Sequence, residues 1–250
     1  MKTKVVFLGS KPIGYQCLDY LIRQQEDLQL EIVGVRTQLR KEFSSAQDLE
    51  ALAKDAGIPL LSSLDQLPEC DLIYSVQHHE LLKAHHISKA SKIAVNLHLA
   101  PLPEYRGCNQ FSFALLDQAA EFGATIHTID TRIDHGDILY ETRFPIPPDC
   151  WVKDLYEITE TRAFALFCAT LPNLVQGHYT RTPQKAFTSR TSSLHFRHEI
   201  QRLKCIDLND SQEKIERIIR AVSMPGFEPP YCIINGQKIY FSKAYKFEPS

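Results

Sequence analysis

Short apolar runs alternate with segments of helical periodicity along the first hundred residues of the chain. The runs at residues 4–9, 29–36 and 71–76 are rich in β-branched side chains, which is typical of buried strands. The first run leads into residues 13–22, where apolar side chains recur at helical spacing after Pro12, a residue suited to the first turn of a helix. This alternation predicts an α/β fold with a Rossmann-like, mostly parallel sheet.

A second helix and a short strand are expected between these runs. Ser45 stands three residues before Asp48, which is close to a capping box, and Gly57 is a helix stop. The sequence therefore predicts a helix between Ser45 and Gly57, followed by a short strand at residues 58–61.

The second half of the chain continues the same patterns. Residues 122–130 and 137–146 alternate as strands, and residues 154–175 carry the apolar stripe of a long helix. A further amphipathic segment at residues 210–222 predicts another helix. Beyond it, Asn-Gly at 235–236 lies between two β-branched runs, which indicates a β-hairpin.

The stretch between the long helix and this last part is polar and irregular, and it separates two units. We expect a Rossmann-like domain over residues 1–177 and a smaller C-terminal extension, made of helix and β-hairpin, over residues 178–250. A chain of 250 residues can bury a substantial core without metal or disulfide bonds.

Composition and charge narrow the class of protein. The net charge is -2 and the sequence pI is near 6.5, so no overall basic field favours nucleic acid or an anionic membrane. The seven cysteines are scattered without a CxxC pair, as expected of reduced thiols in a cytosolic protein. The N-terminal apolar run VVFL is too short for a signal peptide, and no run approaches a membrane span. We therefore expect a cytoplasmic protein that binds neither membrane nor nucleic acid.

The stretch IAVNLHLAPLPEYRG at residues 93–107 carries the strongest chemical signal. Asn96 and His98 stand two apart on a predicted strand, so their side chains point to the same face. Pro101 and Pro103 then end the strand. Open α/β sheets place their chemistry at such strand ends, although a pair of strand-end residues bonded to backbone would show the same spacing.

Two other chemistries are poorly supported. Gly9 and Gly14 form neither G-x-G-x-x-G nor a Walker loop, so this turn predicts an anion site at a helix N-terminus no more strongly than a plain turn. The histidines of QHHELLKAHH, at 78, 79, 85 and 86, pair at seven-residue spacing, which on a helix separates them by about 10 Å. That is too far for one ion, and we expect no metal.

The motifs together resemble a known family. NLHLAPLPEYRG, then GATIH with Thr125 and His127, then TRIDHGDIL, resemble the formyltransferases that use 10-formyltetrahydrofolate. That family carries an Asn-x-His strand end, an LP-x-aromatic-basic-Gly loop, and an Asp 38 residues after the Asn. Here 134 − 96 = 38, so the match falls on Asp134, and Asp137 is expected to be structural. The resemblance covers residues 1 to about 175.

The resemblance implies a catalytic triad of Asn96, His98 and Asp134. The amide and the imidazole would stabilise the oxyanion formed when an amine attacks the formyl carbon. The imidazole would move the proton of the amine, and Asp134 would hold the imidazole by opposite charge. Whether His98 acts first as acid or as base stays open.

The resemblance also implies how the co-substrate, 10-formyltetrahydrofolate, is bound. The family holds the pterin mainly through backbone groups of two segments, one before the Asn-x-His strand and one before the catalytic Asp. By aligned spacing, the residues are His79, Glu80, Leu81, Leu82, Asp130, Arg132 and Ile133.

The C-terminal run IERIIRAVSMPGFEPPYCIINGQKIYF resembles the sugar N-formyltransferases, which formylate a nucleotide-linked 4-amino or 3-amino dideoxyhexose for surface polysaccharide. A pyrophosphate needs cations and N–H groups, and a base needs an aromatic surface. Candidate residues are Ser10, Lys11, Arg197, Arg220, Phe227 and Tyr231. Each has an ordinary surface or packing role as its alternative.

Other readings stay open. Methionyl-tRNA formyltransferases are longer and carry a basic tRNA face, purine transformylases usually lack the hairpin, and formyl-folate hydrolases carry an extra N-terminal domain. A homologue that binds folate or sugar nucleotide without catalysis is a further alternative. The family also implies a homodimer through the C-terminal region, where a hairpin has exposed edges that a second copy would cover.

Overall fold

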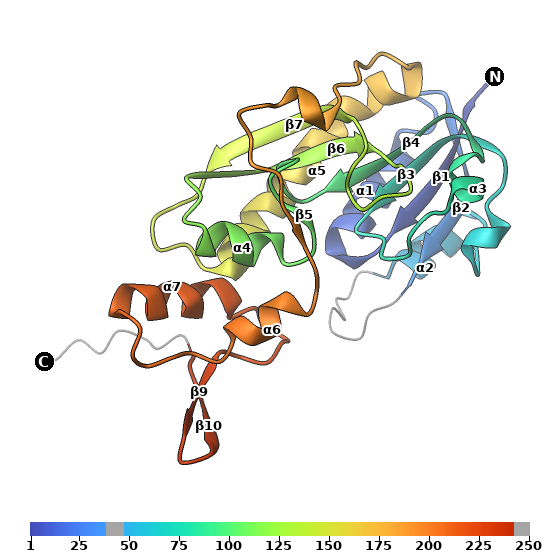
Figure 1. Ribbon diagram of the computed structural model, residues 1–250. Helices are drawn as coiled ribbons and strands as arrows, with labels where there is room; N and C mark the ends of the chain where they lie inside the picture. Colours follow the sequence, from blue (N-terminus) through green and yellow to red (C-terminus); the bar gives the residue numbers. More distant parts are fainter. Residues whose placement is uncertain (39–47, 243–250) are drawn as a thin grey trace, which may run out of the picture.

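A computed structural model describes residues 1–38 and 48–242 of the chain. Its centre is a six-stranded sheet with the order β2-β1-β3-β4-β6-β7, in which β1 to β4 are parallel and β6 and β7 are antiparallel additions (Figure 1). The strands are β1 (Thr3–Gly9), β2 (Leu30–Thr37), β3 (Cys70–Val76), β4 (Ala90–His98), β6 (Glu121–Thr128) and β7 (Ile138–Pro145). The prediction of a mostly parallel α/β sheet is confirmed.

Helices connect these strands and cover the sheet. They are α1 (Lys11–Arg23), α2 (Leu49–Asp55), α3 (Ala84–Ile87), α4 (Gln110–Leu116), α5 (Val152–Gln176), α6 (Glu199–Leu203) and α7 (Gln212–Val222). At the start of the long α5, the Asp154 carboxylate accepts from the backbone N–H of the N-cap residue Trp151 at 3.1 Å. Gly177, whose φ is +78°, caps its other end. Among the residues that the structure describes, no helix is both long enough and apolar enough to cross a membrane.

Alternate residues of each strand enter two different cores. In β1, Val5 and Phe7 join the main core against α1 and α5, whereas Val6 and Leu8 join a smaller core on the opposite face. In β4 the same alternation sends Val95 into the main core, with Ala94 on the other face. Since side chains two apart share a face, Asn96 and His98 lie on the Ala94 face, away from α1 and α5.

The structure corrects one predicted strand and one predicted helix start. Residues 58–61 form no strand, since only Leu60 makes a bridge, to Val35 of β2. Pro59 has no N–H to extend the ladder. The cap of α2 is Asp48, which accepts from the backbone of Glu50 at 2.8 Å, and the predicted start at Ser45 lies outside the described residues.

The C-terminal part contains the predicted hairpin. Strands β9 (Tyr231–Ile234) and β10 (Gln237–Tyr240) pair around Asn235 and Gly236, whose φ angles of 50° and 76° are those of a tight hairpin turn. Helix α7 packs against α4, and the hairpin projects from this end of the molecule (Figure 1). Between α5 and α6, the short strand β8 (Leu194–His195) pairs with β5 (Arg106–Gly107).

Candidate active site

Three elements bring polar side chains together beyond the smaller core. Strand β4 supplies Asn96 and His98, and antiparallel β6 pairs His127 directly opposite Asn96. Asp134 lies in the loop between β6 and β7 with φ +45°, a left-handed conformation that few non-glycine residues adopt. The predicted triad of Asn96, His98 and Asp134 is therefore assembled, with His127 as a fourth member.

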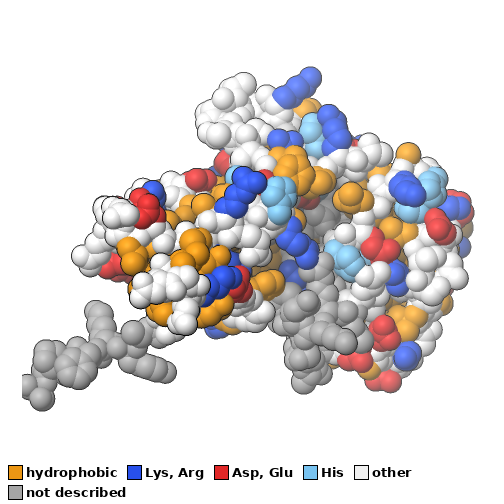
Figure 2. Space-filling view, turned by 60° about the horizontal axis from the view of Figure 1, so that its bottom comes forward, with side chains coloured by type: hydrophobic (Ala, Val, Ile, Leu, Met, Phe, Trp, Pro, Cys, Tyr) orange, Lys and Arg blue, Asp and Glu red, His pale blue; other side chains and the backbone are white. Residues whose placement is uncertain are grey.

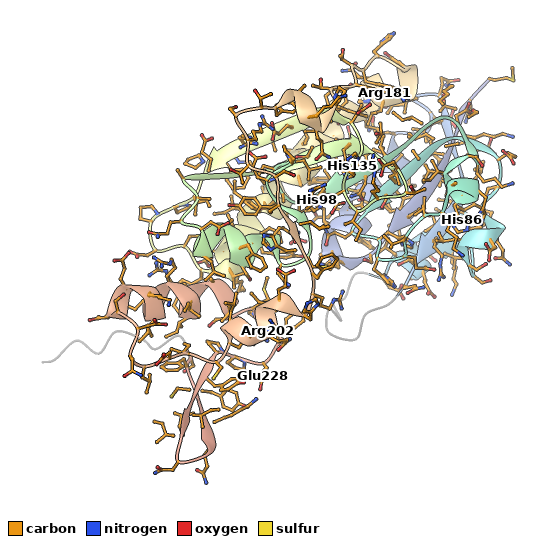
Figure 3. All side chains as sticks on the ribbon, in the orientation of Figure 1. His86, His98, His135, Arg181, Arg202 and Glu228 are labelled. Atoms are coloured by element: carbon orange, nitrogen blue, oxygen red, sulfur yellow. The ribbon has the colours of Figure 1, made fainter. Side chains whose placement is uncertain are left out.

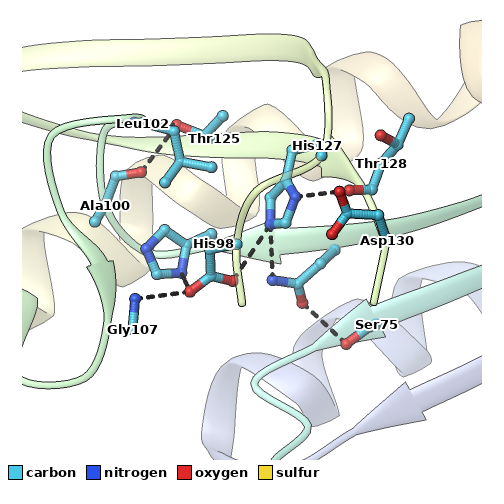
Figure 4. A network of polar contacts seen from close by, with 12 residues as sticks. Ser75, His98, Ala100, Leu102, Gly107, Thr125, His127, Thr128 and Asp130 are labelled. Atoms are coloured by element: carbon cyan, nitrogen blue, oxygen red, sulfur yellow. Dashed lines mark hydrogen bonds and ion pairs between the residues drawn. The ribbon is translucent and has the colours of Figure 1, made fainter. Parts of the chain in front are cut away.

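Asp134 contacts the imidazoles of both His98 and His127, the two rings labelled in Figure 4. Its Oδ2 is 3.6 Å from His98 Nδ1, and its Oδ1 is 3.5 Å from His127 Nε2. The backbone N–H of Gly107 donates to Oδ2 at 2.9 Å. The carboxylate thus joins the loop after β4 to the loop after β6 and touches both rings.

The backbone sets the orientation of the His98 ring. His98 Nε2 lies 2.7 Å from the carbonyl oxygen of Tyr105. A carbonyl only accepts, so Nε2 carries a hydrogen. The other ring nitrogen, Nδ1, therefore faces Asp134 and is the atom placed to exchange a proton.

Asn96 is oriented in a similar way. The Ser75 hydroxyl donates to Asn96 Oδ1 at 2.9 Å, and Asn96 Nδ2 lies 3.2 Å from His127 Nε2. His127 Nδ1 in turn lies 2.9 Å from the Thr128 carbonyl, so Nδ1 carries the ring hydrogen and Nε2 accepts. A primary amide has two N–H groups, and this arrangement directs one to His127 and leaves the second for an oxygen of a bound acyl group.

The electrostatics favour an ionised Asp134. Burial by itself would raise the pKa of this carboxyl, whose side chain is only 15% exposed. The charge of His98, the hydrogen bond that His127 Nε2 donates when its ring is protonated, and the Gly107 N–H together outweigh burial and hold the Asp134 pKa well below its usual range. At neutral pH the site contains a fixed negative charge beside two imidazoles.

The predicted folate segments flank the triad. Residues 79–82 follow β3, and residues 130–133 follow β6. Leu82 is buried in the smaller core, and Ile129, which directly precedes the second segment, packs against the same core. Glu80 accepts from Arg36 Nε at 3.0 Å, and Asp130 accepts from the backbone N–H of Arg132 at 2.8 Å. Leu81 is 69% exposed.

His78 precedes the first of these segments and is unusual. Its side chain is 1% exposed, and neither ring nitrogen has a hydrogen-bond partner among the described residues. Burial lowers the pKa of His78 to about 4, against the opposing charge of Glu80. The two ring nitrogens of this neutral, buried imidazole are therefore available to hydrogen-bond a bound heterocycle.

The six predicted acceptor residues are not brought together. Ser10 and Lys11 lie at the start of α1, where Lys11 Nζ donates to Gln77 Oε1 at 2.7 Å and the Ser10 hydroxyl donates to the Gln77 carbonyl. This places them beside the end of β3, close to Ser75.

The other four residues lie elsewhere. Arg220 on α7 lies 3.5 Å from Asp149 in a separate cavity of about 300 Å³, and Tyr231 packs edge-on against Tyr240 in the hairpin. Phe227 is 47% exposed before the hairpin. Of these four, Arg197 lies nearest in contact to the loop after β4, since the Asn109 side-chain amide of that loop donates to the Arg197 carbonyl at 3.4 Å.

Two histidines of the histidine-rich segment, His85 and His86, lie around Asp65 and not in the site. His85 Nε2 and His86 Nε2 lie 3.5 and 3.1 Å from Asp65 Oδ1, and His86 lies away from the centrally placed His98 (Figure 3). The backbone N–H of Lys83 donates to His86 Nδ1 at 3.2 Å. His86 Nε2 therefore carries the ring hydrogen and donates to Asp65, which is incompatible with ligation of a metal through that atom.

Sequence analysis did not assign a role to three residues that the structure places in the site. His127 contacts both Asn96 and Asp134, Ser75 orients Asn96, and Gln184 donates to the Asp134 carbonyl at 2.7 Å. The Thr-x-His motif on β6 was a usable signal for His127. Ser75 and Gln184 carry no such signal, because only strand pairing and the return of the chain after α5 bring them here.

Comparison with known proteins agrees with this site. Residues 60–171 match the family model described as formyl transferase. The methionyl-tRNA formyltransferase of Lactobacillus delbrueckii subsp. bulgaricus is 29% identical over 259 residues, covering 96% of this chain and 78% of the relative. The GDP-perosamine N-formyltransferase of Brucella melitensis is 28% identical over 171 residues, covering 68% of this chain and 63% of the relative.

Among solved structures, WlaRD, a sugar 3N-formyl transferase crystallised in the presence of dTDP and 5-N-formyl-THF, superposes with a TM-score of 0.79. It is 24% identical, and the match covers 96% of this chain and 85% of that one. The fold is thus that of a formyltransferase. The family model spans the strand that carries Asn96 and His98, so residues 60–171 match a formyl transferase domain, and the relatives and the fold support a formyltransferase enzyme.

Proposed function

We propose that the enzyme transfers the formyl group of 10-formyltetrahydrofolate to the amino group of a nucleotide-linked amino dideoxyhexose, as a step of surface polysaccharide synthesis in the cytoplasm. The observation that carries the chemistry is the placement of Asp134 between His98 Nδ1 and His127 Nε2, beside the oriented amide of Asn96.

In the proposed reaction, Asn96 and His98 work on the same centre from one face of β4. The acceptor nitrogen attacks the formyl carbon, and the Asn96 amide donates to the oxygen that becomes negative. His98 Nδ1 takes part in moving the amine proton toward the departing folate nitrogen. The new C–N bond forms, the bond between the formyl carbon and the folate nitrogen breaks, and Asp134 stabilises the imidazolium in between.

The folate is proposed to lie against residues 79–82 and 130–133. The charged side chains of Glu80 and Asp130 are occupied by Arg36 and Arg132, which leaves backbone groups as the main polar contacts of the two segments. The unused ring nitrogens of buried His78 add polar capacity beneath the first segment. WlaRD, of the same fold, was crystallised with a formyl-folate, which supports this co-substrate.

The sugar nucleotide is proposed to bind on the side of the C-terminal segment. Phe196 is 46% exposed and stacks with His198, and the Asn109 amide ties this segment to the catalytic loop. A cavity of about 250 Å³ lies here, lined by Phe113, His198, Glu199, Arg202 and Leu203. Aromatic and basic side chains are the groups that a base and a diphosphate require, and Arg197, which precedes His198 in the chain, is the predicted residue that fits this position. Lys11 lies apart from it, bonded to Gln77 after β3.

A second acceptor, methionyl-tRNA, is favoured by the 29% identity to the Lactobacillus enzyme over nearly the whole chain. The net charge of -2 weighs against it, because binding of a polyanion draws on a basic surface.

The deciding experiment is a formyl-transfer assay. Purified enzyme and 10-formyltetrahydrofolate are mixed with dTDP- and GDP-linked 3-amino and 4-amino dideoxyhexoses, and with methionyl-tRNA, while tetrahydrofolate release is followed. Release with one sugar nucleotide supports the proposal. Release only with methionyl-tRNA replaces the acceptor, and no release with any of them contradicts the proposal.

A homodimer formed through the hairpin is part of the proposal. Ile233, Ile234, Ile239 and Tyr240 are 58%, 47%, 48% and 51% exposed. The hairpin is a two-stranded sheet, and among the described residues no further strand pairs with the outer edge of β10. Hydrophobic side chains gather on the side of the molecule where this end comes forward (Figure 2). A second copy of the same chain would bury these side chains and cover that edge of β10.

A further inference from the structure

The segment at residues 182–195 returns from the end of α5 to the catalytic loops, outside the stretch that matches the family model. Thr182 exchanges two backbone hydrogen bonds of 2.9 Å with Ile138, and β8 pairs with β5 beside Gly107. The segment thus contacts the loop that follows Asp134 and the loop that carries Gly107. These are the two loops that the carboxylate of Asp134 joins.

Gln184 is the residue of this segment that reaches the Asp134 loop. Its side-chain amide donates to the carbonyl of Asp134 at 2.7 Å and to the carbonyl of Gly136 at 2.9 Å. The residue is 9% exposed. Both hydrogens of the Gln184 amide therefore bond to backbone carbonyls on either side of His135, and neither is left to donate to a substrate.

The backbone of Asp134 needs such support. A φ of +45° at a non-glycine residue is sterically unfavourable and persists where the surroundings over-determine it. On the other side of the loop, Gly136 lies so close to the Thr128 carbonyl that an added Cβ would stand 1.7 Å from it, and Asp137 N donates to Thr128 Oγ1 at 2.8 Å. Gln184 holds the Asp134 and Gly136 carbonyls of the same loop through its side-chain amide.

We propose that Gln184 is a positioning residue that acts through Asp134. By holding the carbonyls of Asp134 and Gly136, its amide keeps the Asp134 carboxylate in reach of both His98 Nδ1 and His127 Nε2. The geometry does not depend on which amine is formylated, and only the activity assay of this inference rests on the proposed function.

The test uses Gln184→Leu, which keeps the volume and removes both donors, with the surface variant Gln212→Leu as matched control. We expect kcat to fall about 10- to 100-fold with KM for the folate within about three-fold, as for an interaction felt in the transition state. Thermal unfolding identifies any variant that has lost its fold. Unchanged kcat in folded Gln184→Leu overturns the proposal.

A double-mutant cycle separates positioning from a general structural role. If Gln184 acts through Asp134, adding Gln184→Leu to Asp134→Asn lowers residual activity by less than two-fold, since coupled residues are non-additive. Fully additive losses overturn the proposal.

Amide hydrogen exchange of the peptide covering residues 128–138 provides a readout that needs no substrate. We expect faster exchange in Gln184→Leu and no change in Gln212→Leu. Unchanged exchange contradicts the positioning role even if the wild-type enzyme shows no turnover with any amine tried, which is the separate failure of the proposed function.

Discussion

The backbone N–H of Gly107 donates to the Oδ2 atom of Asp134 at 2.9 Å, although 27 residues separate the two in sequence. Gly107 has φ +84°, and a Cβ there would stand 2.2 Å from the His195 carbonyl. Any side chain at 107 would therefore displace either the C-terminal segment or the N–H that holds the carboxylate. This contact makes the loop after β4 and the loop after β6 one unit.

Replacing Asn96 with Ala should abolish formyl transfer while folate binding stays within a few-fold. Ser75 orients the amide, which in the proposed reaction donates to the oxyanion, and loss of one such donor costs about 10²- to 10³-fold in kcat. The measurement is tetrahydrofolate release beside fluorescence titration of the folate. Turnover at the wild-type level in this variant would rule out the mechanism.

Asp134→Asn should lower kcat strongly and also change the acid stability of the fold. The folded-state pKa of Asp134 is lowered, so the unfolded state binds more protons at low pH. The stabilisation is complete above the unfolded value of about 3.9 and is lost as pH falls through the folded pKa. Urea unfolding between neutral and acidic pH should show a steeper loss for the wild type than for Asp134→Asn. Parallel curves would contradict this.

His78 should make the protein less stable as pH falls from neutral. Burial lowers its pKa to about 4, below the usual value near 6.5, so the unfolded state binds the extra proton between these values. Stability should be full above about pH 6.5 and fall by on the order of 3 kcal/mol as pH approaches 4. His78→Phe should remove this pH dependence in urea titrations, with the exposed His85→Phe as control. A dependence that survives His78→Phe would assign it to another group.

Arg190→Lys should destabilise the enzyme despite keeping the charge. Arg190 forms two hydrogen bonds of 3.0 and 2.9 Å with the carboxylate of Glu141, and it donates to the Leu102 carbonyl at 2.8 Å. Lysine cannot reproduce the planar fork, and the part-buried Glu141 carboxylate then keeps only its hydrogen bond from Arg143, at a cost of about 1–3 kcal/mol. Thermal unfolding measures this, and Arg202→Lys on α6 provides the comparison. Equal melting of Arg190→Lys and wild type would show that the fork is dispensable.

The double substitution of Ile233 and Ile239 by Glu should convert a dimer to a monomer. Both side chains are about half exposed in the hairpin, and a carboxylate buried at an interface without a partner is costly. Light scattering coupled to size exclusion measures the mass, and Gln237→Glu in the same hairpin is the control. A wild-type protein that is monomeric at micromolar concentration would remove the dimer from the proposal.

The sequence was enough for the strands of the central sheet and for its long helices, though not for residues 58–61, and the resemblance to a known family predicted the triad. Apolar runs and helical stripes depend only on residue type and on spacing along the chain, so they can be recognised without the tertiary structure. The Asn-x-His spacing likewise places both side chains on one face of β4, wherever that strand lies. The 38-residue separation then led to Asp134, and Asn235-Gly236 led to the hairpin, because a tight turn is decided by its own residues.

Tertiary structure alone decided what those residues touch. Gln184, Ser75 and the Tyr105 carbonyl reach the site through chain reversals and strand pairing that no local pattern encodes, so their roles were not predicted. Arg220 and Tyr231 have the right chemistry for a sugar nucleotide, but α7 and the hairpin carry them away from Lys11. Residue type determines which interactions a side chain is able to make, and packing of distant segments determines which of them it makes.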